Sequence, residues 1–121
     1  MINVAISEHI NKHFIGSILI LGLQIEGIIR SILSNQNVNT TITHSNGTIE
    51  EKSLGRLLGS RRTKKILSED LVEYLDVLLI RKEGANLRNR LAHALTRFEE
   101  YTEDLSSLLI LTLLYIDNRT L

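Results

Sequence analysis

Apolar residues recur every three or four positions in four segments of the chain, and this spacing predicts four amphipathic α-helices. The first predicted helix spans about residues 7–33. The second follows Ser68, a suitable N-cap with two acidic residues after it, and stops at residues 81–84, where a glycine suits a helix end. The third spans about 86–98 and the fourth about 102–117. We expect these helices to form an antiparallel four-helix bundle.

Two segments are more apolar than an ordinary surface helix. The fourth predicted helix, which Thr102 is expected to cap, carries leucine or isoleucine on nearly all sides, so it is either central or covered by a partner. The run 14–23 is about half as long as the roughly twenty residues that a membrane span needs, and Gln24 and Glu26 follow it closely. The residues before it lack the features of a signal peptide. We therefore expect a core helix and no membrane association.

The composition changes to asparagine, threonine and serine between the first two predicted helices. Asn46-Gly47, between TIT at 41–43 and TIE at 48–50, is a strong signal for a type I′ β-hairpin. Ser53 is then expected to cap a short helical turn at 54–58. The sequence thus predicts one all-α domain, residues 1–121, with a short β-hairpin inserted after the first long helix.

Composition narrows the classes of function. The 14 basic and 14 acidic side chains give a formal net charge of zero, so no long-range field draws the whole molecule to nucleic acid or membrane. The absence of cysteine excludes disulfides and thiolate chemistry. We expect a cytoplasmic protein, and any binding to a polyanion must be local.

One such local feature is a basic segment. Arg56, Arg61, Arg62, Lys64 and Lys65 lie within ten positions that contain no acid. The sequence leaves two interpretations open, a solvated loop and a functional basic patch.

The stretch NLRNRLAH at 86–93 concentrates polar groups in the third predicted helix. At about 100° per residue, one face of this helix is apolar and is the predicted core face, comprising Leu87, Leu91, Ala94, Leu95 and Phe98. The opposite face carries groups that suit phosphate binding, namely Asn86, Asn89, Arg90, His93 and Arg97. His93 is therefore predicted to point away from its own bundle.

These residues resemble the HEPN superfamily, a group of all-α domains with an Arg-x4–6-His signature. Arg88 and His93 match it with four intervening residues. The run GANLRNRLAH is similar to an uncharacterised HEPN-like domain found at the C-terminus of larger proteins, although Ala94 stands where glycine commonly follows the histidine. A looser resemblance at 23–30, in the Asn/Thr-rich segment and at 54–58 extends it over most of the chain.

The resemblance implies a metal-independent endoribonuclease without a cofactor, usually a homodimer whose two motifs meet across the interface. Attack by a ribose 2′-OH needs a base, an acid and positive charge near the phosphate, which histidine and arginine supply. One histidine per copy is too few, and a twofold dimer supplies two. The expected catalytic residues are Arg88, His93 and Asn89. The expected substrate-binding residues are Arg90, Asn86 and Arg97, with Glu26 and Arg30 in support.

Several alternatives stay open. Arg88 and His93 diverge by about 140° on a regular helix, so Arg88 must reach from the first turn or act across the dimer, and Arg90 is the reserve arginine. The expected partners are RNA, a second copy, and an antitoxin or a larger parent protein, with a toxin, defence or RNA-processing role. The alternative function is a non-catalytic HEPN-like module for dimerisation or for RNA or nucleotide binding, and a purely structural bundle is third. His9 and His13 lack a carboxylate pattern that would complete a metal site.

Overall fold

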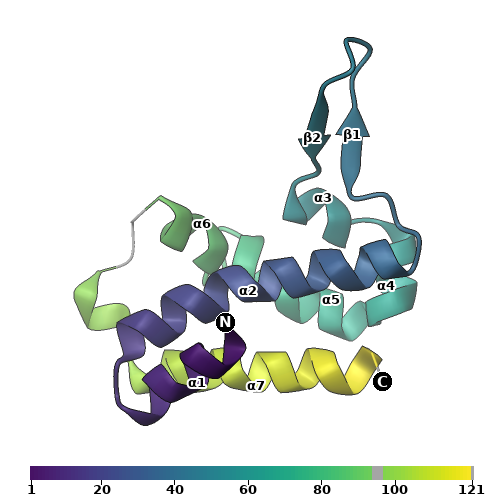
Figure 1. Ribbon diagram of the computed structural model, residues 1–121. Helices are drawn as coiled ribbons and strands as arrows, with labels where there is room; N and C mark the ends of the chain where they lie inside the picture. Colours follow the sequence, from purple (N-terminus) through teal and green to yellow (C-terminus); the bar gives the residue numbers. More distant parts are fainter. Residues whose placement is uncertain (94–96, 121) are drawn as a thin grey trace.

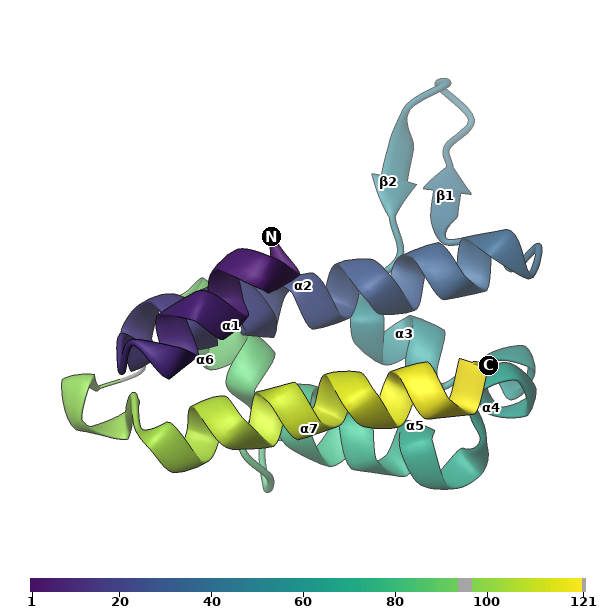
Figure 2. The same cartoon turned by 60° about the horizontal axis from the view of Figure 1, so that its bottom comes forward.

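The computed structural model describes residues 1–93 and 97–120, which are mostly helical and include a small two-stranded antiparallel sheet. The elements in chain order are α1 (Ile2–Ile10), α2 (Phe14–Asn35), β1 (Thr41–Thr43), β2 (Ile49–Glu51), α3 (Leu54–Leu58), α4 (Arg61–Leu67), α5 (Glu69–Leu75), the π-helical turn η1 (Asp76–Ile80), α6 (Leu87–Ala92), the 3-10 turn η2 (Phe98–Glu100) and α7 (Glu103–Thr120). α2 runs through the middle and contacts α1, α7 and α6, and α1 lies alongside its N-terminal half (Figures 1 and 2).

The expected first helix at 7–33 is two helices, which corrects the sequence prediction. α1 ends at Ile10, the chain turns through Lys12 at a positive φ of 63°, and α2 begins at Phe14. α1 then folds back along α2, and this buries Ala5. The apolar spacing continues through the turn, so periodicity alone does not reveal the break. Ile10, the last residue of α1, is 70% exposed.

A chain of hydrogen bonds through two buried serine hydroxyls joins α1, α2 and α7. The Oγ of Ser106 in α7 lies 2.7 Å from Nδ1 of His9 in α1 and 2.8 Å from Oγ of Ser17 in α2. Both serine side chains are fully buried. Buried hydroxyls are costly without partners, so this chain fixes the position of α1 rather than presenting a nucleophile to solvent.

α2 is long and apolar enough to cross a membrane by length and composition. The core helix of a soluble protein passes the same test but is mostly buried, whereas 33% of the most apolar window of α2 is buried in this fold. The middle of α2 also carries Glu26 and Arg30, which are ion-paired and which are expensive to place in hydrocarbon. This ion pair favours the core helix that the sequence predicts.

The hairpin forms where expected and stands away from the helices (Figure 1). Its turn differs from the prediction. Thr43 pairs with Ile49, the His44 N–H donates to the Thr48 carbonyl, and among the residues of the loop Gly47 alone has a positive φ, 87°. A type I′ turn needs positive φ at both central residues, so this is a three-residue loop closed by a left-handed glycine. The extra residue moves β2 to Ile49–Glu51.

Several local predictions are confirmed. Ser53 and Ser68 cap α3 and α5 by accepting hydrogen bonds from backbone N–H groups, and Thr102 caps α7 in the same way. Most of the basic segment lies in α4, whose N-terminus Ser60 caps by accepting from the Arg62 N–H, so it is not an irregular loop. This does not decide whether its charges have a function. α7 is not buried all round, since Leu111 is 61% exposed.

The third predicted helix at 86–98 is too long. α6 ends at Ala92, with His93 as its C-cap. Phe98 lies in η2 and is 75% exposed, so it does not belong to the core face. Ala94 and Leu95, also expected on that face, lie outside the described residues. Leu87 and Leu91 alone confirm the predicted core side.

Candidate functional site

Two close approaches position α6. Its first residue, Leu87, is buried in the core, and Leu91 packs over Gly22 of α2. A Cβ at Gly22 would lie 2.4 Å from Leu91 Cδ1, so glycine allows this approach. In the turn before α6, a Cβ at Gly84 would lie 2.2 Å from the Val77 carbonyl oxygen. Gly84 therefore serves as the point where the backbone returns against η1, and not as a left-handed helix cap.

An ion-pair network joins α6 to α2. Arg88 Nε donates to Glu26 Oε1 at 2.9 Å, and Arg30 Nε donates to the other carboxylate oxygen of Glu26 at 3.3 Å. Arg30 also reaches the base of the hairpin, where it donates to the Lys52 carbonyl at 2.7 Å and to Glu51 at 3.3 Å. The structure thus brings Arg88, Glu26 and Arg30 into one network.

The ion pair leaves most of the Arg88 fork available. Only Nε contacts Glu26, and within the described part of the chain both Nη groups lack a hydrogen-bond partner. The Arg88 side chain is 38% exposed, whereas that of Glu26 is 19% exposed. A partly buried carboxylate therefore orients a guanidinium whose outer edge can still bind two oxygens of one phosphate.

The remaining polar residues of α6 are held by local contacts. Asn86 begins the element in a left-handed conformation (φ 49°), which asparagine tolerates, and its Oδ1 accepts a hydrogen bond from Asn89 Nδ2 at 2.9 Å. Arg90 forms an ion pair with Glu100 of η2. The other carboxylate oxygen of Glu100 accepts from the Arg97 backbone N–H at 3.4 Å.

Glu100 is a site residue that the sequence did not single out. It lies ten positions after Arg90, a spacing that falls on no common helix face. The contact arises because α6 ends early and η2 brings the carboxylate back. No local sequence signal indicates this pair.

His93 stands at the end of α6 with an exposed side chain. Its backbone N–H donates to the Asn89 carbonyl at 3.0 Å, which completes the last turn. Within residues 1–93 and 97–120 no hydrogen bond or ion pair engages the imidazole. Arg88 is directed toward α2 while His93 is exposed, so the divergence expected from their spacing persists in the structure.

An exposed apolar stripe on α2 lies on the same face of the helix as Glu26 and Arg30. Ile15, Leu19 and Leu23 are exposed and lie four residues apart, hence on one face of the helix. Glu26 and Arg30 fall within about 80° of Ile15 on the same helical wheel. Exposed apolar surface of this kind, rimmed by polar groups, is typical of an interaction surface.

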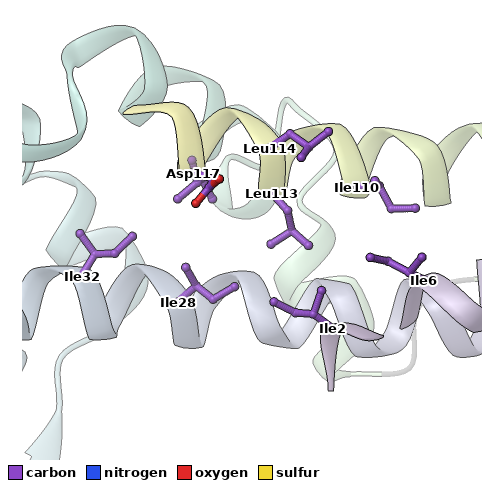
Figure 3. A pocket seen from close by; sticks show the side chains of 9 residues that line it. Ile2, Ile6, Ile28, Ile32, Ile110, Leu113, Leu114 and Asp117 are labelled. Atoms are coloured by element: carbon purple, nitrogen blue, oxygen red, sulfur yellow. The ribbon is translucent and has the colours of Figure 1, made fainter. Parts of the chain in front are cut away.

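Other parts of the chain offer little for catalysis. An apolar groove of about 390 Å³ lies between α1, α2 and α7, where Ile2 and Ile28 lie on one side and Leu113 of α7 on the other (Figure 3). In the described residues, no three histidine or acidic side chains gather in a way that would hold a metal ion. Hydrogen bonds from Arg81 to Asp76 and then Glu73 raise the pKa of Arg81, which keeps it a fixed cation beside η1.

Comparisons with protein-family models, curated proteins and solved structures find no match to this chain. The informative arrangement is the polar side of α6, with its exposed histidine, its oriented arginine and the neighbouring apolar stripe of α2.

Proposed function

We propose that this chain is a HEPN-type, metal-independent endoribonuclease that acts as a homodimer. The observation that carries the proposal is the placement of Arg88 and His93 on one short helix, with Arg88 oriented by Glu26 and the imidazole exposed. In this proposal α2, α5 with η1, α6 and α7 correspond to the four helices of a HEPN-like bundle, and the hairpin is an insertion.

The proposed reaction needs no metal and no cofactor. The imidazole of His93 takes the proton from a ribose 2′-OH, whose oxygen attacks the adjacent phosphorus. The bond from phosphorus to the 5′-oxygen then breaks, and the partner's His93 donates the proton to that leaving oxygen. The products are a 2′,3′-cyclic phosphate and a 5′-OH end. The Nη groups of Arg88 stabilise the charge on the phosphorane, and Asn89 orients the phosphate.

Three further residues are proposed to bind RNA on either side of the scissile phosphate. They are Arg90, Asn86 and Arg97. Glu26 and Arg30 are positioning residues, because they act through Arg88 rather than on the substrate. Arg90 is partly neutralised by Glu100, so it contributes less positive charge than Arg88.

Dimerisation follows from the chemistry of a site with one histidine per copy. The exposed stripe of Ile15, Leu19 and Leu23 supports α2 as the contact surface, because burying it would bring two Glu26–Arg88 networks toward each other. We further propose a cytoplasmic protein with a toxin, defence or RNA-processing role, paired with an antitoxin or carried by a larger parent protein.

A second candidate is a non-catalytic HEPN-like module that dimerises or binds RNA or nucleotide. The ion pairs themselves favour it, since Glu26 and Glu100 offset the charge of the two arginines that catalysis needs. The two candidates differ in one measurable property, which is cleavage that depends on His93.

The test is incubation of the purified chain with RNA in EDTA, followed by analysis of the ends. The expected result is fragments with 2′,3′-cyclic phosphate ends that the His93→Ala variant does not produce. His44→Ala is the matched control, because His44 is also exposed but lies on the hairpin. Cleavage that survives His93→Ala, or no cleavage by the unmodified chain, rejects the nuclease and leaves the binding module.

A further inference from the structure

The cations of this chain differ in whether an acid neutralises them. The arginines near α6 and η1 are ion-paired with carboxylates, namely Arg30, Arg81, Arg88 and Arg90. A second group is exposed on α3 and α4, and none of its members has an ion pair or side-chain hydrogen bond within the described chain. This group, the α3–α4 basic surface, comprises Arg56, Arg61, Lys64 and Lys65.

Local structure keeps these side chains in solvent. Thr63 and Leu67 form the buried side of α4, and Arg61 and Lys65 lie one turn apart on the outward side. Arg62 anchors the helix by donating to the Gln36 carbonyl at 2.6 Å, at the C-terminal end of α2. α4 therefore presents its cations from a fixed position.

The surroundings leave this charge largely uncompensated. Residues 52–68 contain no acid. Glu73 and Asp76 line a pocket of about 240 Å³ together with Lys64, but both carboxylates are already paired with Arg81. Glu69 and Asp70 follow in the first turn of α5, where the helix dipole stabilises them. Arg61 and Lys65 repel each other at a spacing of four residues, and an anion between them would relieve the repulsion.

We propose that the α3–α4 basic surface binds the phosphodiester backbone of RNA at a distance from the cleavage site. This rests on the proposed function, because it extends the substrate from the α6 site to a second contact. Unpaired cations release their counterions when they bind phosphates, which favours binding. The arginines of the α6 site are already paired with carboxylates, so their charge contributes less to RNA affinity. The paired site positions one phosphate, and the free surface supplies affinity.

The fold sets the length of RNA that can reach both places. α6 packs against α2 near Gly22 and Glu26, and α4 is anchored ten residues further along, at Gln36. Ten residues of α-helix span about 15 Å. α3 and α6 lie along the same side of α2 (Figure 1). A helical strand rises about 3.4 Å per nucleotide, so the RNA must extend about five nucleotides beyond the α6 site.

The deciding variant is Arg61→Glu. It places an acid in the first turn of α4, where the helix dipole favours it, and four residues before Lys65, where it forms a favourable pair. The variant should unfold at an equal or higher temperature than the unmodified chain. A loss of binding in this variant is therefore not a loss of folding. Lys12→Glu is the matched control, since it makes the same charge change at the opposite end of α2.

Binding is measured by fluorescence anisotropy with a 2′-O-methyl oligouridylate of twenty nucleotides, which lacks the attacking hydroxyl. Arg61→Glu is expected to raise the Kd about fivefold and to lower the slope of log K against log salt by about 0.7, the value for one lost phosphate contact on a single strand. Lys12→Glu is expected to change neither. An oligomer of four nucleotides can occupy only one of the two places, so it should bind the unmodified chain more weakly than the twenty-nucleotide oligomer does.

Several outcomes overturn the proposal. An unchanged Kd for Arg61→Glu does so, and so does an equal loss for Lys12→Glu. Anionic phosphatidylserine vesicles form a parallel arm, and a loss of vesicle binding with RNA binding intact assigns the surface to a membrane instead. The proposed nuclease fails separately. If Arg61→Glu weakens RNA binding but no cleavage depends on His93, the RNA-binding role of the α3–α4 basic surface is supported and the chain is a non-catalytic RNA-binding module.

Discussion

Arg88 and Glu26 are separated by 62 positions in the sequence, yet their side chains meet at 2.9 Å. The contact ties the helix that carries the candidate signature to the central helix of the fold. It also gives Glu26 a specific task, which is to orient a guanidinium whose outer edge faces solvent. The task can be separated from a purely structural role by experiment.

Glu26→Gln is expected to lower kcat for RNA cleavage about tenfold. The neutral amide holds the Arg88 guanidinium less firmly than the carboxylate does, so the guanidinium is positioned less well for the phosphate. The free energy of unfolding should fall by less than about 1 kcal/mol, since the pair is partly exposed. Kinetic assays and urea unfolding measure the two effects. Glu51→Gln is the control, as it removes a carboxylate from Arg30 and leaves Arg88 untouched. Unaltered kcat in Glu26→Gln would contradict the positioning role.

Leu23→Glu is expected to convert a dimer to a monomer, because it places a charge within the apolar stripe of α2. Light scattering of the purified chain gives the solution mass. Leu111→Glu on α7 is a closely matched control, since the two leucines are 60% and 61% exposed and lie on different helices. Disruption by Leu111→Glu instead of Leu23→Glu would show that the copies meet through α7 and not through the stripe on α2.

Gly84→Ala is expected to destabilise the fold by about 1–3 kcal/mol, because the new Cβ meets a backbone carbonyl that cannot move aside like a side chain. Gly27→Ala serves as a comparison. A Cβ at Gly27 meets nothing within 4 Å, so alanine in the middle of α2 should stabilise by about 0.5–1 kcal/mol. Chemical unfolding of both variants measures the difference. A neutral Gly84→Ala would mean that the turn before α6 can be rebuilt without strain.

Thr63→Val is expected to stabilise the chain by about 1 kcal/mol. Within the described residues Thr63 Oγ1 is buried without a hydrogen-bond partner, so replacing it by a methyl group removes an unmet desolvation cost. Thr112→Val is the matched contrast, because Thr112 Oγ1 donates to the Leu108 carbonyl at 2.8 Å and lies 2.8 Å from the Tyr74 hydroxyl. That variant should lose about 1 kcal/mol. Equal shifts in the two melting temperatures would contradict the conclusion that Thr63 Oγ1 lacks a hydrogen-bond partner.

The sequence by itself determined the helical class, the position of the hairpin and the caps at Ser53, Ser68 and Thr102. These features depend on hydrogen bonds and side-chain spacings within a few residues, which the order of amino acids encodes directly. The exposed side chain of His93 also followed from spacing, because it lies opposite the buried Leu87 on one short helix.

Tertiary structure alone decided where helices end and which charges are paired. The turn at Lys12 exists because α1 gains a buried surface by folding back on α2, and the apolar spacing on either side of the turn does not reveal it. The pairing of Glu26 with Arg88 depends on distances between segments far apart in the chain. So does the lack, within residues 1–93 and 97–120, of any such partner for Arg61 on the α3–α4 basic surface. Local patterns carry no information about such distances, because packing of the whole core sets them.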